Sequence, residues 1–269
     1  MAFIRFFQLI GDFCLMLIVW GYFLFGFLFI LPFLFIPCYL FTKNSAGAIQ
    51  KLFYLHMKFF FYLAGRLIPR TTYKIDPEVR ALRSSVIVSN HLSYLDPILL
   101  VSLFPRQTTI IKKTFFRVPV FGWFMKKAGY VSSSPSEMTG AAMINNLESI
   151  KAHLAAGGNL FLFPEGTRSR DGRLGPFNKG VFSIARYCNT GLKLVYIQGT
   201  DKLFPPGSFF FRTREKNTIS MELIATLTPD YSAKNFSINA VAEQTRQIFE
   251  RKITDVKAAQ PEKNITLNQ

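Results

Sequence analysis

The sequence predicts an α/β domain built on a largely parallel sheet flanked by helices, with an N-terminal membrane-embedded helical segment in front of it. Past Pro69, short apolar runs rich in β-branched residues alternate with helical runs, and this order is typical of a parallel sheet covered by helices. Ahead of that point, residues 1–42 contain one basic residue, Arg5, and one acidic residue, Asp12. Residues 1–42 therefore suit a lipid environment, and the region past Pro69 suits water.

The apolar stretch is long enough to cross a bilayer. No charged residue occurs from Phe13 to Phe41, whereas about 20 apolar residues cover the hydrocarbon core. A cleaved signal peptide has an apolar region of about 7–15 residues that ends at a small-residue site. Neither condition is met, so we expect the segment to be retained. Pro32 and Pro37 interrupt its second half, which leaves open one tilted span or a helix followed by a kinked, re-entrant piece.

The chain is strongly basic, and its charge is unevenly placed. The formal net charge is +16, and the excess lies after residue 42. An anionic membrane surface and nucleic acid are the usual partners of such a balance. The apolar N-terminus favours the lipid bilayer, so we expect no nucleic-acid partner. Basic residues also gather on the C-terminal flank of the apolar segment, which places the rest of the chain on the cytoplasmic face of the cell inner membrane. These flanking residues are Lys43, Lys51, Lys58, Arg66 and Arg70.

The cysteine content indicates neither a metal centre nor a disulfide framework. Cys14, Cys38 and Cys188 lack metal-ligand spacing, and two of them lie in the apolar segment. Free thiols suit a reducing compartment. We therefore expect no metal site.

Residues 51–69 are still apolar and aromatic, yet polar side chains recur at three- to four-residue steps. The recurring residues are Lys51, Lys58, Tyr62 and Arg66. This pattern is typical of an amphipathic helix in the membrane interface, with its basic side chains toward headgroups. A helix buried against the globular domain has a similar pattern, and both interpretations stay open.

The remaining pattern predicts six strands and five helices. The expected strands are Val86–Ser89, Thr108–Lys112, Tyr130–Ser133, Asn159–Phe163, Leu192–Gln198 and Ile219–Thr226. The expected helices are Ile98–Phe104, Gly122–Lys127, Met138–Ala156, Gly180–Cys188 and Phe236–Lys252. We expect three regions: membrane-anchoring or interfacial helices over 1–70, an α/β domain over 71–255, and a polar tail over 256–269.

The first candidate site follows the strand at Val86–Ser89. His91 lies just past the end of this strand, and Asp96 follows five residues later. On one regular helix these side chains would point about 140° apart. If His91 lies in a loop and the next helix begins between Ser93 and Pro97, the carboxylate can fold back onto the imidazole. A histidine held by an aspartate is the arrangement of a general base.

A second polar loop follows the strand at Asn159–Phe163. Glu165, Gly166, Thr167 and Arg168 supply an acceptor, backbone freedom, a hydroxyl and a fixed cation. Sites of α/β sheets collect at the carboxyl ends of strands, so we expect this loop and the His91 loop to share one site. The spacing of a nucleotide-binding phosphate loop is absent.

A basic and aromatic block lies between the two loops. Lys112 and Lys113 open it, and no acid occurs from Pro97 to Ser136. Such a surface could contact nucleic acid, but beside a membrane segment it better fits lipid headgroups. Its other members are Phe115, Phe116, Arg117, Phe121, Trp123, Phe124, Lys126 and Lys127.

These motifs resemble those of the glycerolipid acyltransferases, the bacterial-type 1-acylglycerol-3-phosphate acyltransferases. Asn90–Asp96 is similar to the H-x4-D box of that family, and Phe163–Arg170 is similar to its F-P-E-G-T-R box. Residues 177–180 resemble the F-K-x-G run, and 113–129 resemble the intervening block. The likeness covers roughly residues 80–200, and two boxes in the right order are far more specific than one.

The resemblance implies transfer of a fatty acyl group from a thioester to the hydroxyl of a lyso-lipid such as 1-acylglycerol 3-phosphate. It implies His91 as general base and Asp96 as its partner. Glu165, Gly166, Thr167, Arg168, Lys112 and Lys113 are the expected substrate-binding residues. We expect no cofactor: the donor substrate is acyl-coenzyme A or an acyl carrier protein thioester. No G-x-S-x-G nucleophile elbow is present, which disfavours a serine hydrolase.

The sequence departs from the family pattern at two places. The arginine of the G-x-x-F-I-D-R pattern is missing, because Gly129 is followed by Tyr130-Val131-Ser132-Ser133-Ser134-Pro135. The V-P-V-x-I-x-G segment appears at 194–199 without its proline. The acceptor is therefore lysophosphatidate, bound through Arg168, Lys112 or Lys113, or another lyso-lipid. The alternative function is a non-catalytic membrane protein that binds anionic lipid through the basic aromatic block.

Overall fold

The computed structural model describes residues 2–169, 172–208 and 210–259, with side chains from residue 10 onward. Its core is a seven-stranded sheet in the order β1-β7-β6-β2-β5-β3-β4. The strands are β1 (Thr71–Ile75), β2 (Val86–Ser89), β3 (Gln107–Ile111), β4 (Val131–Ser132), β5 (Asn159–Leu162), β6 (Leu192–Gln198) and β7 (Asn217–Leu227). Five neighbouring strands, from β6 to β4, are parallel, whereas β7 and its parallel partner β1 run the opposite way. The prediction of a largely parallel sheet is confirmed.

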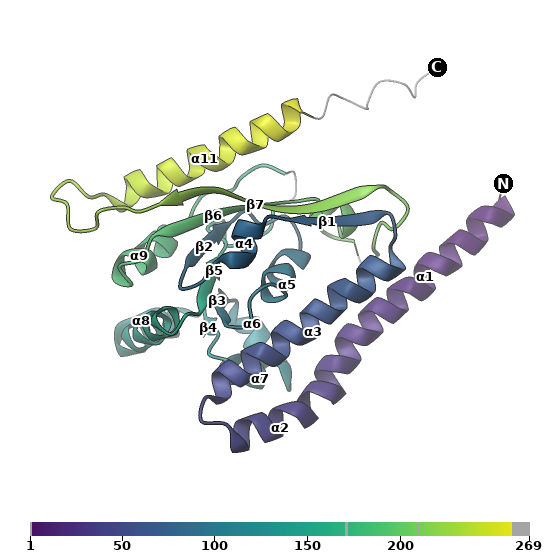
Figure 1. Cartoon of the computed structure of the whole chain (residues 1–269), viewed down its shortest axis with the longest axis horizontal. Coiled ribbons are helices and arrows are strands. Elements are labelled where there is room, and N and C mark those ends of the chain that lie inside the picture. The colour runs from purple at the N-terminus through teal and green to yellow at the C-terminus, as the bar shows by residue number, and fades with distance from the viewer. Residues whose placement is uncertain (1, 170–171, 209, 260–269) are drawn as a thin grey trace.

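The helices cover both faces of the sheet (Figure 1). The longer helices are α1 (Ala2–Phe25), α2 (Leu31–Phe41), α3 (Ser45–Leu67), α8 (Gly140–Ala155), α9 (Gly180–Tyr187) and α11 (Ile238–Ala258). The short helices are α4 (Pro77–Ala81), α5 (Leu95–Val101), α6 (Lys113–Phe116), α7 (Phe121–Lys127) and α10 (Thr200–Leu203). A 3₁₀ turn at Pro135–Glu137 precedes α8.

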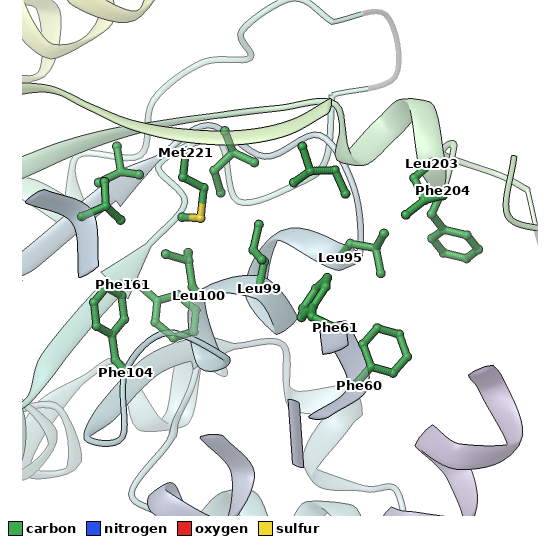
Figure 2. Close-up of a cluster of buried hydrophobic side chains, with 14 of the residues drawn as sticks. Phe60, Phe61, Leu95, Leu99, Leu100, Phe104, Phe161, Leu203, Phe204 and Met221 are labelled. Carbon is green, nitrogen blue, oxygen red and sulfur yellow. The ribbon is translucent and has the colours of Figure 1, made fainter. Parts of the chain in front are cut away.

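Alternation along the central strands creates two hydrophobic cores. Val86 and Val88 of β2 face the helices α8, α9 and α11, whereas Ile87 faces the opposite side. The core on the Ile87 side contains Phe161 of β5, Leu99 of α5, Phe104 just after α5, and Phe60 of α3 (Figure 2). Side chains of a strand alternate between the faces of its sheet, so a continuous apolar run such as 86–88 feeds both cores.

The apolar N-terminal segment lies along the α/β domain. Residues 10–41 form the one stretch in the described part of the chain that is long and apolar enough to cross a membrane, with a mean hydropathy of 2.5. A π-helical turn at Gly26–Ile30 joins α1 to α2, and Pro37 lies inside α2. The helix runs antiparallel to α3 (Figure 1). The prolines therefore leave a continuous, bent helical path.

Both ends of this apolar path are attached to the α/β domain. At the N-terminal end, Asp12 accepts hydrogen bonds from Arg214 and Thr213, each at 2.6 Å. At the C-terminal end, the Lys127 ammonium donates to the Tyr39 hydroxyl at 2.9 Å and lies 4.4 Å from the centre of the Tyr39 ring. Between them, Val19, Leu31 and other side chains are buried. Both ends of the segment therefore contact the α/β domain.

Helix α3 has a buried face and an exposed face. Ile49, Phe53, Met57 and Phe60 are buried, and α3 contributes to the core that contains Phe124 and Met125 of α7. Lys51 and Tyr62 are among its exposed residues. The interpretation of 51–69 as a helix packed on the globular domain is thus confirmed, and contact of its exposed face with the membrane interface stays a prediction.

Several features of the fold differ from the sequence-based expectation. The helices α4, α6 and α10 were not predicted, because four or five residues are too few to show a helical period. Strand β1 was not predicted, because its alternation is short and polar at its start. The polar tail was expected from residue 256, but α11 continues to Ala258, since Val256 still packs on the core beneath the helix. Residues 260–269 of that tail lie outside the described residues.

Candidate active site

His91 and Asp96 meet at the carboxyl end of β2. His91 lies in the loop after the strand, and α5 begins at Leu95, inside the predicted window. The Nδ1 atom of His91 lies 2.9 Å from Oδ2 of Asp96. The Asp96 side chain is 0% exposed and that of His91 is 14% exposed. The predicted pairing of these two side chains is confirmed.

The hydrogen bonds around Asp96 fix the form of the histidine ring. Oδ2 of Asp96 also accepts the backbone N–H groups of Leu92 at 2.6 Å and Ser93 at 2.8 Å. These two N–H groups hold Oδ2 toward the ring, and an ionised carboxylate can only accept hydrogen bonds. The Nδ1 atom of His91 therefore carries a proton, and the lone pair of the neutral ring lies on Nε2. The ring of Phe163 stacks on the imidazole, with centroids 4.3 Å apart.

The loop after β5 holds the main chain of His91 on both sides. Oε1 of Glu165 accepts the N–H of His91 at 3.0 Å, and the N–H of Ser169 donates to the carbonyl of His91 at 2.8 Å. Oε2 of Glu165 accepts the N–H of Gly175 at 2.9 Å. The two predicted loops are therefore joined directly, and both Glu165 oxygens are engaged with backbone groups.

Burial raises the pKa of the Glu165 carboxyl, and the N–H groups of Gly175 and His91 offset part of this rise. An acid whose pKa is higher in the folded than in the unfolded chain binds more protons when folded. The folded state then loses stability as pH rises from the ordinary pKa of 4.5 to the raised value. Glu165 thus opposes folding in its charged form.

Replacement of Glu165 by glutamine removes this pH dependence. We expect the thermal midpoint of wild type to fall relative to that of Glu165→Gln as pH rises from 4.5. Above the raised pKa the difference becomes constant. Unfolding in detergent followed by circular dichroism measures both midpoints, and Glu78→Gln, at an exposed glutamate, is the matched control. A difference that stays flat across the window would show that Glu165 does not titrate as described.

Arg168 lies over the exposed ring of Tyr94, with Cζ 3.4 Å from the ring centre. Its Nη1 is buried and donates no hydrogen bond to any residue that the structure describes. An ion pair with Glu165 or Asp171 would instead give Arg168 a role in ordering the loop. Arg168 makes no ion pair with Glu165, whose two oxygens accept backbone N–H groups, and Asp171 lies outside the described residues. The guanidinium thus has unused donors beside the His91 loop.

The other predicted binding residues lie at the same edge of the sheet. Gly166 adopts a φ of +65°, which favours glycine, and Thr167 is exposed beside it. Lys112 and Lys113 are exposed at the start of α6, directly after β3. Since β3 is paired with β5 and β5 with β2, the two lysines lie two strands from His91, at about 5 Å per strand.

Asn90 is a part of the site that the sequence did not single out. Its side chain donates to the carbonyl of Ile197 and accepts the N–H of the same residue, each at 2.8 Å. It thereby continues the pairing of β2 with β6 by one residue and fixes where the His91 loop starts. Ser93 anchors the other end, because its hydroxyl donates to the carbonyl of Phe204. The sequence signal that could have identified Asn90 is a polar residue directly after an apolar strand.

The candidate site pairs one histidine with one aspartate. In residues 2–169, 172–208 and 210–259, no group of three His, Cys, Asp or Glu side chains is arranged to hold a metal ion. The fold and the site define a class of protein: an α/β domain with an H-x4-D histidine–aspartate pair beside an E-G-T-R loop. Residues 70–226 match the model of the family described as Acyltransferase. The chain therefore belongs to the acyltransferase family.

Relatives and a solved structure agree with this assignment. The chain is 41% identical over 123 residues to the chloroplastic 1-acyl-sn-glycerol-3-phosphate acyltransferase BAT2 of Brassica napus, a match of 46% of this chain and 35% of the relative. It is 39% identical over 124 residues to the chloroplastic 1-acyl-sn-glycerol-3-phosphate acyltransferase LPAT1 of Arabidopsis thaliana, and this match covers 46% of this chain and 34% of the relative. The matches thus span about a third of these curated relatives.

The crystal structure of the 1-acyl-sn-glycerophosphate acyltransferase PlsC from Thermotoga maritima has the same fold. Its TM-score is 0.68 at 21% identity, and the match covers 93% of this chain and 98% of that one. The fold, including the N-terminal helices, is therefore shared over nearly the whole chain.

Proposed function

We propose that this protein is a membrane-bound lipid O-acyltransferase that moves a fatty acyl group from a thioester to the hydroxyl of a lysophospholipid. The observation that carries the proposal is the His91–Asp96 pair at 2.9 Å, held by the loop of Glu165 and Arg168. It is supported by the relatives, whose names describe acylation of 1-acyl-sn-glycerol 3-phosphate.

The chemistry requires one base and one source of positive charge. Nε2 of His91 takes the proton of the lipid hydroxyl as its oxygen attacks the thioester carbonyl. Asp96 stabilises the imidazolium that forms. When the carbon–sulfur bond breaks, the imidazolium returns the proton to the leaving thiolate. No acyl-enzyme is needed, because a thioester is already electrophilic.

Arg168 is the proposed contact for negative charge on the acceptor or on the reacting oxygen. Its buried Nη1 has no partner among the described residues, and a guanidinium binds phosphate strongly. Lys112 and Lys113 are placed to add charge where the family's arginine is absent. Gly166 and Thr167 shape the loop between Glu165 and Arg168. Glu165 positions His91 rather than reaching the substrate.

A panel of lyso-lipids tests the acceptor. Membranes with the purified chain are given labelled acyl-coenzyme A or the labelled acyl carrier protein thioester, and products are read by mass spectrometry. We expect an acylated phospholipid, with lysophosphatidate among the accepted substrates. If none of the lyso-lipids in the panel is acylated from either donor, the proposal is wrong.

An exposed apolar surface supports the proposed placement at a membrane. Phe33 and Phe41 are 76% and 84% exposed, and the patch continues over Leu17, Ile18, Leu24, Phe25, Leu28, Phe29 and Leu40. A contiguous surface of this size fits lipid. Asp12–Arg214 and Tyr39–Lys127 keep both ends of the helix at the domain, so we propose that the segment enters one leaflet, at the cytoplasmic face of the inner membrane.

Labelling with a membrane-impermeant maleimide tests this placement. In a chain whose three native cysteines are serine, Gly11→Cys, Lys43→Cys and Lys234→Cys mark the helix start, the turn after α2 and the domain. A side chain at Gly11 meets no atom within 4 Å. In sealed vesicles with the domain outside, we expect all three to react. Protection of Gly11→Cys alone would indicate a full membrane crossing.

The alternative function is a non-catalytic protein that binds anionic lipid through the basic aromatic block, which includes the exposed Trp123. It predicts salt-sensitive vesicle binding without thioester consumption, and His91→Ala would leave that binding unchanged. Acyl transfer by the wild-type chain excludes it.

A further inference from the structure

The aromatic ring of Tyr94 joins the two loops of the candidate site. Tyr94 lies between His91 and Asp96 in the loop after β2, and it is 49% exposed. Arg168 lies in the loop after β5, and its Cζ atom lies 3.4 Å from the centre of the Tyr94 ring. This contact therefore links the loop that carries the histidine to the loop that carries the guanidinium.

The residues on both sides of Tyr94 are anchored inside the domain. The hydroxyl of Ser93 donates to the carbonyl of Phe204 at 2.8 Å, and Oδ2 of Asp96 accepts the N–H of Ser93 at 2.8 Å. Leu95, on the other side, is 1% exposed. Tyr94 thus projects from a turn whose neighbours are buried, and this turn gives the ring a firm support.

The contact fixes the plane of the guanidinium of Arg168. Non-bonded carbon atoms touch at about 3.5–4 Å, so a Cζ atom 3.4 Å from the ring centre requires the guanidinium to lie nearly parallel to the ring. A tilted group would push one of its nitrogen atoms into the ring. Both Glu165 oxygens accept backbone N–H groups, so no ion pair with Glu165 competes for this orientation. Tyr94 thus covers a face of the guanidinium and not the edge that carries the N–H groups.

We propose that Tyr94 is a positioning residue that holds Arg168 for the phosphate of the acceptor lipid. This inference rests on the proposed function, in which Arg168 contacts negative charge. A guanidinium binds phosphate through two parallel N–H bonds in its own plane, and a group that is already oriented loses less freedom on binding. Because Tyr94 and His91 lie in one loop, the ring also sets the place of the phosphate relative to the base.

A double-mutant cycle of Tyr94→Leu and Arg168→Ala tests this role. Leucine is apolar but has no aromatic face, so we expect Tyr94→Leu to raise KM for lysophosphatidate about fivefold, the scale of a cation–π contact. The kcat should stay within about twofold of wild type, as expected for a loss of binding alone. In the Arg168→Ala background, Tyr94→Leu should have no further effect on KM. Initial rates on vesicles of graded lysophosphatidate content give both constants.

Two further variants separate the aromatic face from other effects of the change. Tyr94→Phe keeps the face and removes the hydroxyl, so KM is expected to stay within about twofold of wild type. Tyr187→Leu is the matched control, because Tyr187 is also an exposed tyrosine beside a cation, with the Lys151 ammonium 5.9 Å from its ring centre. It should leave KM unchanged. Vesicle flotation of each variant checks that membrane binding is equal.

Equilibrium binding of labelled lysophosphatidate to the chain in detergent, without thioester, repeats the cycle where no turnover is needed. Coupled losses of affinity in this assay support the role of Tyr94 even if no acyl transfer occurs, and in that case the proposed function alone fails. An effect of Tyr94→Leu that persists undiminished in Arg168→Ala would overturn the proposal. An equal loss in Tyr94→Phe, or unchanged KM and affinity in Tyr94→Leu, would overturn it as well.

Discussion

His91→Ala should lower the rate of acyl transfer by about three orders of magnitude, the typical contribution of a positioned general base. The imidazole is the only group in the described site with an available lone pair that a bound carboxylate orients. The measurement is the initial rate of labelled acyl transfer to the preferred lyso-lipid in vesicles.

The fold should survive this change. Without the ring, Asp96 still accepts the N–H groups of Leu92 and Ser93, so the loop keeps two of its bonds. Vesicle flotation and the thermal midpoint are therefore expected to stay close to wild type. Turnover at the wild-type rate in His91→Ala would contradict the assignment of His91 as the general base.

Asp96→Asn should impair both activity and stability. The amide oxygen of asparagine carries no negative charge, so in the place of Oδ2 it accepts these three donors more weakly. Its NH2 group takes the place of Oδ1, which is buried and has no hydrogen-bond partner among the described residues. Loss of a buried hydrogen bond to a charged acceptor costs about 2 kcal/mol. The ring of His91 also loses the partner that fixes its tautomer, and we expect the rate to fall by about two orders of magnitude or more.

Comparison with His91→Ala separates the two roles of Asp96. The thermal midpoint should fall further in Asp96→Asn than in His91→Ala, although both lose activity. Asp76→Asn is the matched control, because the Asp76 side chain makes no cap hydrogen bond to α4. If Asp96→Asn has wild-type activity and stability, the carboxylate does not hold the ring in the manner described.

Six of the seven strands and the histidine–aspartate pair could be predicted because local signals define them. Val86–Ser89 is a run of apolar and β-branched residues that ends at a buried asparagine. The spacing of His91 and Asp96 required a loop followed by a helix start, which Pro97 favours. The direction of β7 and β1 had no such signal, since alternation does not distinguish parallel from antiparallel pairing.

The contacts of Glu165 and of the N-terminal helix needed the three-dimensional structure. A carboxylate in a loop can accept from a substrate or from backbone amides, and only the fold shows that His91 and Gly175 are its donors. A lipid bilayer and a protein core both favour apolar residues, so composition does not distinguish the two environments. The sequence of 13–41 therefore indicated burial in an apolar phase, and the packing of Val19 and Leu31 on the domain was not visible in it.

The most direct test of the proposed reaction is its stoichiometry in a single turnover. Excess chain is mixed with labelled acyl thioester, with and without lyso-lipid, and the thiol, the lipid product and the intact protein mass are followed together. Direct transfer to the lipid hydroxyl predicts one acylated lipid for each thiol released, an unchanged protein mass, and little thiol release without lyso-lipid. Equal thiol release without lyso-lipid, or a chain that gains the acyl mass before product appears, would contradict it.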